Sequence, residues 1–218
     1  MPICDLVLPC RDEGPALASL LPRVPSAFSV IVVDNGSRDD TAEVAARLGA
    51  RVVREDVPGY GSAIHAGLLA ATRDYVAFMD GDGSFDPDEL LPLLADVSSG
   101  RADIALGRRR PVARGVWPWH ARAGNALIVA WLRRRLRMQA HDIAPMRVVR
   151  RQDLLDLALA DRRFGYPVEL LQEVTRAGWR VSERDVAYHP RAEGTRSKVS
   201  GSLMGTLRTA RDFWKVLS

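Results

Sequence analysis

The sequence predicts an α/β fold in which helices flank a mostly parallel central sheet. Short runs of strand-forming residues alternate with helical segments of about 10–15 residues over the first half of the chain, which is the pattern of consecutive βαβ units. The run at residues 30–33 is apolar at every position, as expected for a strand that is covered on both faces. With 218 residues, 47% of them hydrophobic, the chain is large enough to bury such a sheet in one domain.

The elements of the first half follow from local signals. Apolar and β-branched residues concentrate in five expected strands, at residues 5–8, 30–33, 51–54, 75–79 and 103–106. The first expected helix has Pro15 in its first turn, and the second is capped by Asp39 or Asp40 and ended by Gly49. Helices are expected at residues 14–21, 40–48, 61–71 and 87–97, followed by a basic loop at 108–115.

The second half is less regular. Helices are expected at residues 119–136, 151–160 and 168–177, and strands at 143–149 and 180–188. A polar loop at 190–201 leads into an amphipathic helix at 202–218, which suits packing on the domain or contact with an anionic membrane surface.

Composition favours a cytoplasmic protein with anionic partners. Lys and Arg total 31 and Asp and Glu total 27, so the net charge is +4, which by itself does not choose among phosphates, acidic lipids and nucleic acid. No apolar run approaches the roughly 18 residues that cross a bilayer, and the N-terminus does not resemble a signal peptide.

Acidic residues follow three of the expected strands. Asp12 and Glu13 come after the first strand, Asp34 ends the second, and Asp80 and Asp82 follow the fourth. Ligands of such sheets bind at the carboxyl ends of the strands, so we expect these side chains to converge on one edge.

The segment Asp80-Gly81-Asp82 is the strongest candidate for chemistry. In extended backbone, residues two apart point the same way, so both carboxylates could face one Mg²⁺ or Mn²⁺ ion together with phosphate oxygens. Gly81 would let a ligand approach the backbone closely. The alternative is an acidic turn, because Asp and Gly are common turn residues.

At these residues the chain resembles a known family. Residues 8–13, 33–41 and 79–84 resemble the three opening motifs of family 2 glycosyltransferases, which have the GT-A (Rossmann-like) fold, and residues 59–61 fit as well. Residues 142–147 resemble the D-x-x-P-F-R segment of the family, with Met146 in place of Phe. Residues 191–201 resemble the R-x-x-G-x-S-K-x-S-G segment of polyprenyl-phosphate and dolichyl-phosphate glycosyltransferases.

The resemblance implies a role for each matching position. A nucleotide-diphospho-sugar donor would be contacted by Pro9, Asp12 or Glu13, Asp34 and Gly61. The diphosphate and its metal would lie at Asp80, Gly81 and Asp82, with Asp82 preferred as the direct metal ligand. Phosphate groups would meet four cationic side chains, namely Arg147, Arg191, Arg196 and Lys198.

Glu169 is a candidate general base on the acceptor side, and Asp142 is the other carboxylate of this region. The alternative for Glu169 is a surface residue that the helix dipole favours in a first turn. A phosphate acceptor already carries negative charge and would need no base. We expect Trp117 and Trp119 to be packing residues; the alternative is that they contact an acceptor or lipid.

The expected activity is inverting sugar transfer, with a polyprenyl phosphate as the leading acceptor and a soluble hydroxyl compound as the second. Residues 1–110 would bind the donor, 111–201 would form the acceptor side of the same domain, and 202–218 would add a peripheral contact at the inner face of the membrane. We expect no nucleic-acid partner. A sugar nucleotidyltransferase is less compatible, because residues 9–14 lack a basic glycine-rich phosphate loop, and a non-catalytic nucleotide-sugar-binding protein would not need both Asp80 and Asp82.

Overall fold

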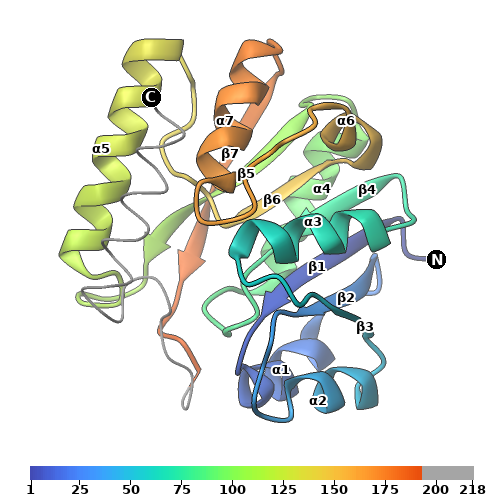
Figure 1. Cartoon of the computed structure of the whole chain (residues 1–218). Coiled ribbons are helices and arrows are strands. Elements are labelled where there is room, and N and C mark those ends of the chain that lie inside the picture. Colours follow the sequence, from blue (N-terminus) through green and yellow to red (C-terminus); the bar gives the residue numbers. More distant parts are fainter. Residues whose placement is uncertain (193–218) are drawn as a thin grey trace.

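The computed structural model describes residues 1–192 of the chain. Its centre is a seven-stranded sheet with the order β3-β2-β1-β4-β6-β5-β7 (Figure 1). The strands are β1 Cys4–Cys10, β2 Phe28–Asp34, β3 Arg51–Arg54, β4 Tyr75–Phe78, β5 Ile104–Pro111, β6 Met146–Arg150 and β7 Val181–Tyr188. Strands β1 to β4 run parallel and β6 runs antiparallel to both of its neighbours, which confirms the mostly parallel sheet.

Helices cover both faces of this sheet (Figure 1). They are α1 Gly14–Leu20, α2 Thr41–Arg47, α3 Tyr60–Ala70, α4 Leu90–Ser98, α5 Trp119–Leu136, α6 Arg151–Asp156 and α7 Tyr166–Arg176, with short 3-10 turns at Leu21–Arg23 and Pro87–Glu89. Alternation along the strands divides the core in two, because successive side chains point to opposite faces. Val7 and Phe78 pack with α3, α5 and α7, whereas Leu6 and Ala77 pack with α1, α2 and α4.

The prediction of a basic loop at 108–115 is wrong for residues 108–111, which belong to a strand. Arg108, Arg109 and Arg110 belong to β5, which pairs in parallel with β7 up to Pro111. Asp185 of β7 explains the difference, because its carboxylate binds Arg108 at 2.6 Å and Arg110 at 2.8 Å. Neutralised in this way, consecutive arginines can form part of a strand.

In the second half of the chain, two boundaries differ from the expectation by more than two residues. Strand β6 begins at Met146 rather than at 143, because the backbone N–H of Ile143 donates to the side chain of Asn125 instead of joining the sheet. Helix α6 ends at Asp156 rather than at 160, and Ala158 then takes a left-handed conformation with φ 49°. The helix expected at 202–218 lies outside the described residues.

Among residues 1–192, no helix is both long enough and apolar enough to cross a membrane.

Candidate functional site

The sheet brings the three acidic clusters to one edge, as expected. Cys10 pairs with Asp34 across β1 and β2, and Val7 pairs with Phe78 across β1 and β4. Because these strands are parallel, the residues that follow them emerge side by side. Asp12, Asp34 and Asp80 therefore lie at the carboxyl ends of adjacent strands, where α/β sheets bind their ligands.

The loops after β1 and β2 hold one another in place. Asp12 has φ 52°, and its carboxylate accepts the backbone N–H of Arg38 at 2.7 Å. The backbone N–H of Glu13, a residue only 7% exposed, donates to the Thr41 hydroxyl at 2.9 Å. Asp34 closes a local turn by accepting the N–H of Ser37 at 2.9 Å. One oxygen each of Asp12 and Asp34 is thus committed to backbone.

Asp80 and Asp82 form the acidic centre of the edge. Asp82 is 1% exposed and accepts the backbone N–H of Ser84 at 2.9 Å, while Asp80 is partly exposed. Burial raises the pKa of Asp80 to about 6, and the neighbouring charge of Asp82 adds to the effect. Arg191, Arg109 and Arg147 oppose this rise, so three cations act on the pair.

Gly81 and Gly61, the two glycines predicted to contact the donor, pack closely against other parts of the chain. A Cβ on Gly81 would lie 2.4 Å from the sulfur of Cys10, and a Cβ on Gly61 would lie 2.7 Å from the backbone of Arg162. Close packing of the chain therefore already requires glycine at both positions. Gly61 also donates its N–H to the carbonyl of Arg163 at 3.0 Å, which ties α3 to the loop before α7. Pro9 is half-buried in β1 opposite Val33.

Arg191 pairs directly with the predicted metal ligand. Its Nη1 lies 2.9 Å from Oδ2 of Asp82. The backbone keeps it there, because the N–H of His189 donates to the carbonyl of Ser84 and that of Ala192 to the carbonyl of Asp82. A cation thus already neutralises Asp82, and the residues after β7 lie against the acidic centre.

A divalent metal ion fits the donor set of this centre. Mg²⁺ and Mn²⁺ prefer oxygen ligands, and the pKa of Asp80 is raised by burial and then by the charge of Asp82, so a cation would stabilise the ionised pair. Among residues 1–192, no group of three or more His, Cys, Asp or Glu side chains gathers at one point. The ion would therefore complete its coordination with phosphate oxygens and water, as a nucleotide-bound ion does.

Arg147 is buried beside this centre with spare hydrogen-bonding capacity. It lies on β6, between Phe78 of β4 and Leu106 of β5, and is 1% exposed. Its Nη2 donates to the carbonyl of Ile143 at 3.2 Å, but Nε and Nη1 have no hydrogen-bond partner among the described residues. Buried nitrogens without hydrogen-bond partners are unfavourable, so this geometry is typical of a site that receives an anion.

Arg109 is a residue that the sequence analysis missed. Its guanidinium forms a two-bond ion pair with Asp142, at 2.9 and 2.7 Å, and its Nη2 donates to Asn125 of α5 at 3.3 Å. It also stacks 4.0 Å from the ring centroid of Trp117, and its charge acts on Asp80. Alternation in a strand turns Arg109 away from Arg108 and Arg110, and only the assignment of β5 as a strand reveals this.

Asp142 is the structural partner of Arg109. It is 1% exposed, and both oxygens accept from Arg109, including its backbone N–H at 2.9 Å. Burial opposes ionisation, but the hydrogen bonds from Arg109 outweigh it and hold the pKa of Asp142 below its usual value. An ionised, fully engaged carboxylate is suited to positioning Arg109.

Glu169 lies in the first turn of α7, with both oxygens engaged. Oε1 accepts the backbone N–H of Ala160 at 2.9 Å, and Oε2 accepts that of Asp161 at 2.7 Å. The side chain thus holds the loop between α6 and α7. Its assignment as a general base stays a prediction. The predicted phosphate contacts Arg196 and Lys198 lie outside the described residues.

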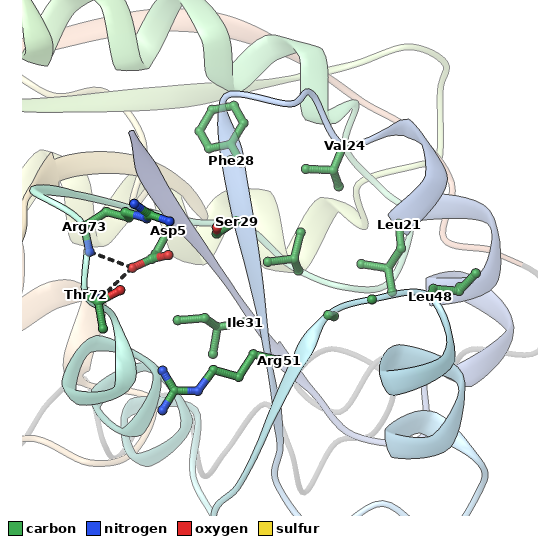
Figure 2. A pocket seen from close by; sticks show the side chains of 13 residues that line it. Asp5, Leu21, Val24, Phe28, Ser29, Ile31, Leu48, Arg51, Thr72 and Arg73 are labelled. Carbon is green, nitrogen blue, oxygen red and sulfur yellow. Dashed lines mark hydrogen bonds between the residues drawn. The ribbon is translucent and has the colours of Figure 1, made fainter. Parts of the chain in front are cut away.

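A separate pocket of about 420 Å³ lies at the opposite end of the sheet (Figure 2). Asp5, Phe28 and Arg51, at the amino ends of β1, β2 and β3, are among the residues that line it. Asp5 points toward the chain after α3, where it accepts the N–H groups of Thr72 and Arg73 at 2.6 and 2.9 Å. This carboxylate serves the fold, and the pocket is remote from the acidic edge.

Comparison with known proteins identifies the family. The model of glycosyl transferase family 2 matches residues 5–156, which include β1 to β6 and the whole acidic edge. An uncharacterized glycosyltransferase of Mycobacterium tuberculosis (strain ATCC 25618 / H37Rv) is 55% identical over 213 residues, covering 98% of this chain and 97% of the relative. A polyprenol monophosphomannose synthase of Mycolicibacterium smegmatis is 31% identical over 216 residues, covering 90% of this chain and 81% of the relative.

A solved structure shares the fold. Glucosyl-3-phosphoglycerate synthase from Mycobacterium tuberculosis, in complex with Mn²⁺, UDP-glucose and phosphoglyceric acid, superposes with a TM-score of 0.75 at 23% identity. The match covers 99% of this chain and 78% of that one, and confirms the predicted GT-A fold. By the family match and this shared fold, the chain belongs to glycosyltransferase family 2, as its motifs predicted.

Proposed function

We propose that the chain transfers a sugar, with inversion, from a nucleotide-diphospho-sugar to a polyprenyl phosphate. The donor would bind where β1, β2 and β4 end, with the base and ribose near Asp12 and Asp34 and the diphosphate near Asp80 and Asp82. A bound Mg²⁺ or Mn²⁺ ion would neutralise charge on the diphosphate. The related polyprenol monophosphomannose synthase supports this choice of acceptor.

The main observation for a phosphate acceptor is the pairing pattern beside the acidic centre. Arg147 is buried with two unpartnered nitrogens, and Arg109 is fixed by Asp142 with its charge acting on Asp80. In both carboxylates considered as bases, Glu169 and Asp142, each oxygen already accepts a hydrogen bond. The site therefore offers cations rather than a base, which suits a nucleophile that is already ionised.

In the proposed reaction, a phosphate oxygen of the acceptor attacks the anomeric carbon of the donor sugar. The bond from that carbon to the diphosphate oxygen breaks, and the nucleoside diphosphate leaves with the electron pair. Arg109 and Arg147 would hold the acceptor phosphate, and Arg191 would turn from Asp82 to the leaving diphosphate. Such cations stabilise charge as it develops, the usual source of electrostatic catalysis.

A soluble acceptor is the second candidate. Glucosyl-3-phosphoglycerate synthase shares the fold and was solved with phosphoglyceric acid, a soluble compound that also carries a phosphate. A neutral hydroxyl acceptor fits less well, because both oxygens of Glu169, one of which would have to take the proton, already accept the N–H groups of Ala160 and Asp161.

The test is sugar transfer with UDP-, GDP- and dTDP-sugars and Mn²⁺, offered polyprenyl phosphate, unphosphorylated polyprenol or phosphoglyceric acid. We expect labelled sugar to enter the organic phase only with polyprenyl phosphate, and to give the inverted anomer. Transfer to polyprenol alone, or to phosphoglyceric acid alone, would overturn the proposed acceptor.

We also propose that residues 1–110 and 111–201 act as donor and acceptor halves of one domain, at the cytoplasmic face of the membrane. The sheet supports a single domain, because β6 pairs with β4 of the first half. The peripheral role proposed for residues 202–218 rests on their sequence alone.

A further inference from the structure

One segment of the chain is rich in arginine and has no acidic residue. Between Asp103 and Asp142, residues 104–141 contain nine arginines and no Asp or Glu, although Asp and Glu number 27 in the whole chain. The segment forms β5, the connection at 112–118 and helix α5. Among residues 1–192, ion pairs neutralise only part of this charge, as in Arg109 with Asp142 and Arg110 with Asp185.

Helix α5 presents an apolar surface outward. It lies at the outer edge of the molecule, beside α7 (Figure 1). Trp119 is 81% exposed and Leu127 is 73% exposed, whereas Val129 and Leu132 on the other side are buried. At about 100° per residue, Trp119, Leu127 and the exposed Ala123, Ala126 and Ala130 share one side of the helix. We call this side, with the exposed Val112 before it, the α5 face.

Exposed arginines surround the α5 face. Arg122 lies beside its first turns, and Arg133 and Arg134 continue the same side at the C-terminal end. Burying a tryptophan and a leucine would be favourable, and arginines placed beside them select an anionic partner. Apolar side chains flanked by arginines are the pattern of helices that lie in the headgroup region of anionic bilayers.

Other occupants match the α5 face less well. In a two-fold dimer the same face would meet itself, so the arginines of both copies would approach one another without any acidic residue of the helix to offset them. A nucleic acid would accept the arginines, but it offers no apolar environment to Leu127 and Val112. A bilayer with anionic headgroups satisfies both parts of the surface.

We propose that the α5 face docks the protein on an anionic lipid bilayer. The inner side of α5 reaches the site, because Asn125 accepts from both Arg109 and Ile143. Docking through this helix would hold Arg109 near the membrane surface, where a lipid-linked phosphate is presented. The link to the acceptor rests on the proposed function, whereas the docking surface itself rests only on exposure and charge.

The test is flotation of the full chain with vesicles of phosphatidylcholine, with or without phosphatidylglycerol. We expect binding to the anionic vesicles, and a loss of about tenfold or more in partitioning for Leu127→Glu. The matched control is Leu69→Glu, at a residue 58% exposed on α3, which should float like the wild type. Arg133→Gln with Arg134→Gln should reduce the preference for phosphatidylglycerol.

Thermal unfolding and nucleotide-sugar binding in solution would show that each variant is folded and retains its donor site. Equal flotation of Leu127→Glu and the wild type would overturn the proposal. It would also be overturned if binding depended on Trp214, in the segment 202–218 expected to be an amphipathic helix, and not on Leu127. The proposal would also fail if Leu127→Glu abolished self-association or DNA binding while vesicles were not bound at all. Transfer to detergent-dispersed polyprenyl phosphate tests the activity separately, since it needs no docking.

Discussion

The two sides of the site are built from opposite charges. On the proposed donor side, Asp12, Asp34 and Asp82 each accept a backbone N–H from the loops around them. On the proposed acceptor side, Arg109 and Arg147 are held in the sheet by β5 and β6, and the nearby carboxylates of Asp142 and Glu169 already accept hydrogen bonds. One side therefore suits a metal-bound diphosphate, and the other suits an anion without a metal.

The two sides also differ in whether their contacts are local or long-range in the sequence. Asp34 bonds to a residue three positions away and Asp82 to one two positions away, so a motif in the sequence contains most of the geometry. Arg109 is positioned by Asp142, 33 residues later in the chain. Asp82 pairs with Arg191, which follows β7, the edge strand of the sheet. The cationic side exists only once the sheet has formed.

The largest expected effect is on the donor side. Asp82→Ala should reduce metal-dependent donor binding and transfer by roughly 10²- to 10³-fold, because it removes the proposed direct metal ligand and leaves Arg191 without its partner. Calorimetric titration with Mn²⁺ and nucleotide-sugar measures this loss. The control is Asp88→Ala, an exposed residue of the same loop region. Unchanged Mn²⁺-dependent binding in Asp82→Ala would refute the metal assignment.

The acceptor side should respond next. Arg109→Gln should lower kcat/KM for polyprenyl phosphate by about 100-fold while donor binding changes little, because it removes the cation that we propose holds the acceptor phosphate. Arg110→Gln, which removes an exposed arginine one residue away, should change it less than twofold or so. The double variant Arg109→Gln with Asp142→Asn relieves the unpaired buried carboxylate. If it regains full transfer, Arg109 serves only the fold.

This difference between local and long-range contacts explains which features could be predicted from the sequence and which could not. The order of strands and helices and the convergence of Asp12, Asp34 and Asp80 follow from local patterns and from the rule for parallel sheets, and the structure agrees. Arg109 could not be predicted as a site residue, because three consecutive arginines are typical of a loop. Only the structure shows that Asp185 of β7 pairs with Arg108 and Arg110, so that all three arginines belong to a strand. The two backbone bonds of Glu169 likewise depend on a loop whose path has no signature in the sequence.

Glu169 offers a smaller effect that separates the two acceptor classes. Glu169→Gln should change kcat less than about tenfold, because an ionised phosphate needs no base, whereas loss of a true base costs 10²–10⁴-fold or thereabouts. It should also destabilise the fold by about 1–3 kcal/mol, because the amide places an N–H donor against a backbone N–H donor. Glu173→Gln on the same helix is the control. A loss of the acidic limb of the pH–kcat profile, the fall in kcat at low pH, would instead restore the assignment as a base.

The smallest expected effect is on the free energy of unfolding, which the ionised Asp80 lowers by lying buried beside Asp82. The pKa of Asp80 is raised to about 6, above the value of about 3.9 in an unfolded chain, so folding takes up a proton between these two values. The corresponding stability is complete below pH 4 or so and is lost as the pH rises through about 6. Asp80→Asn carries no charge to repel Asp82, so without metal it should be more stable than the wild type at pH 8, by about 1–2 kcal/mol after allowing for partial exposure.

Thermal unfolding in EDTA at pH 8 and near pH 4.5 measures this difference, which should shrink at the lower pH as Asp80 becomes protonated in the wild type. Addition of Mn²⁺ and nucleotide should reverse the order, since only the wild type then gains ligand stabilisation. A variant that is less stable at pH 8 without metal would mean that Arg191, Arg109 and Arg147 already compensate the pair fully. The two sides would then differ only at Arg147, whose Nε and Nη1 have no hydrogen-bond partner among the described residues.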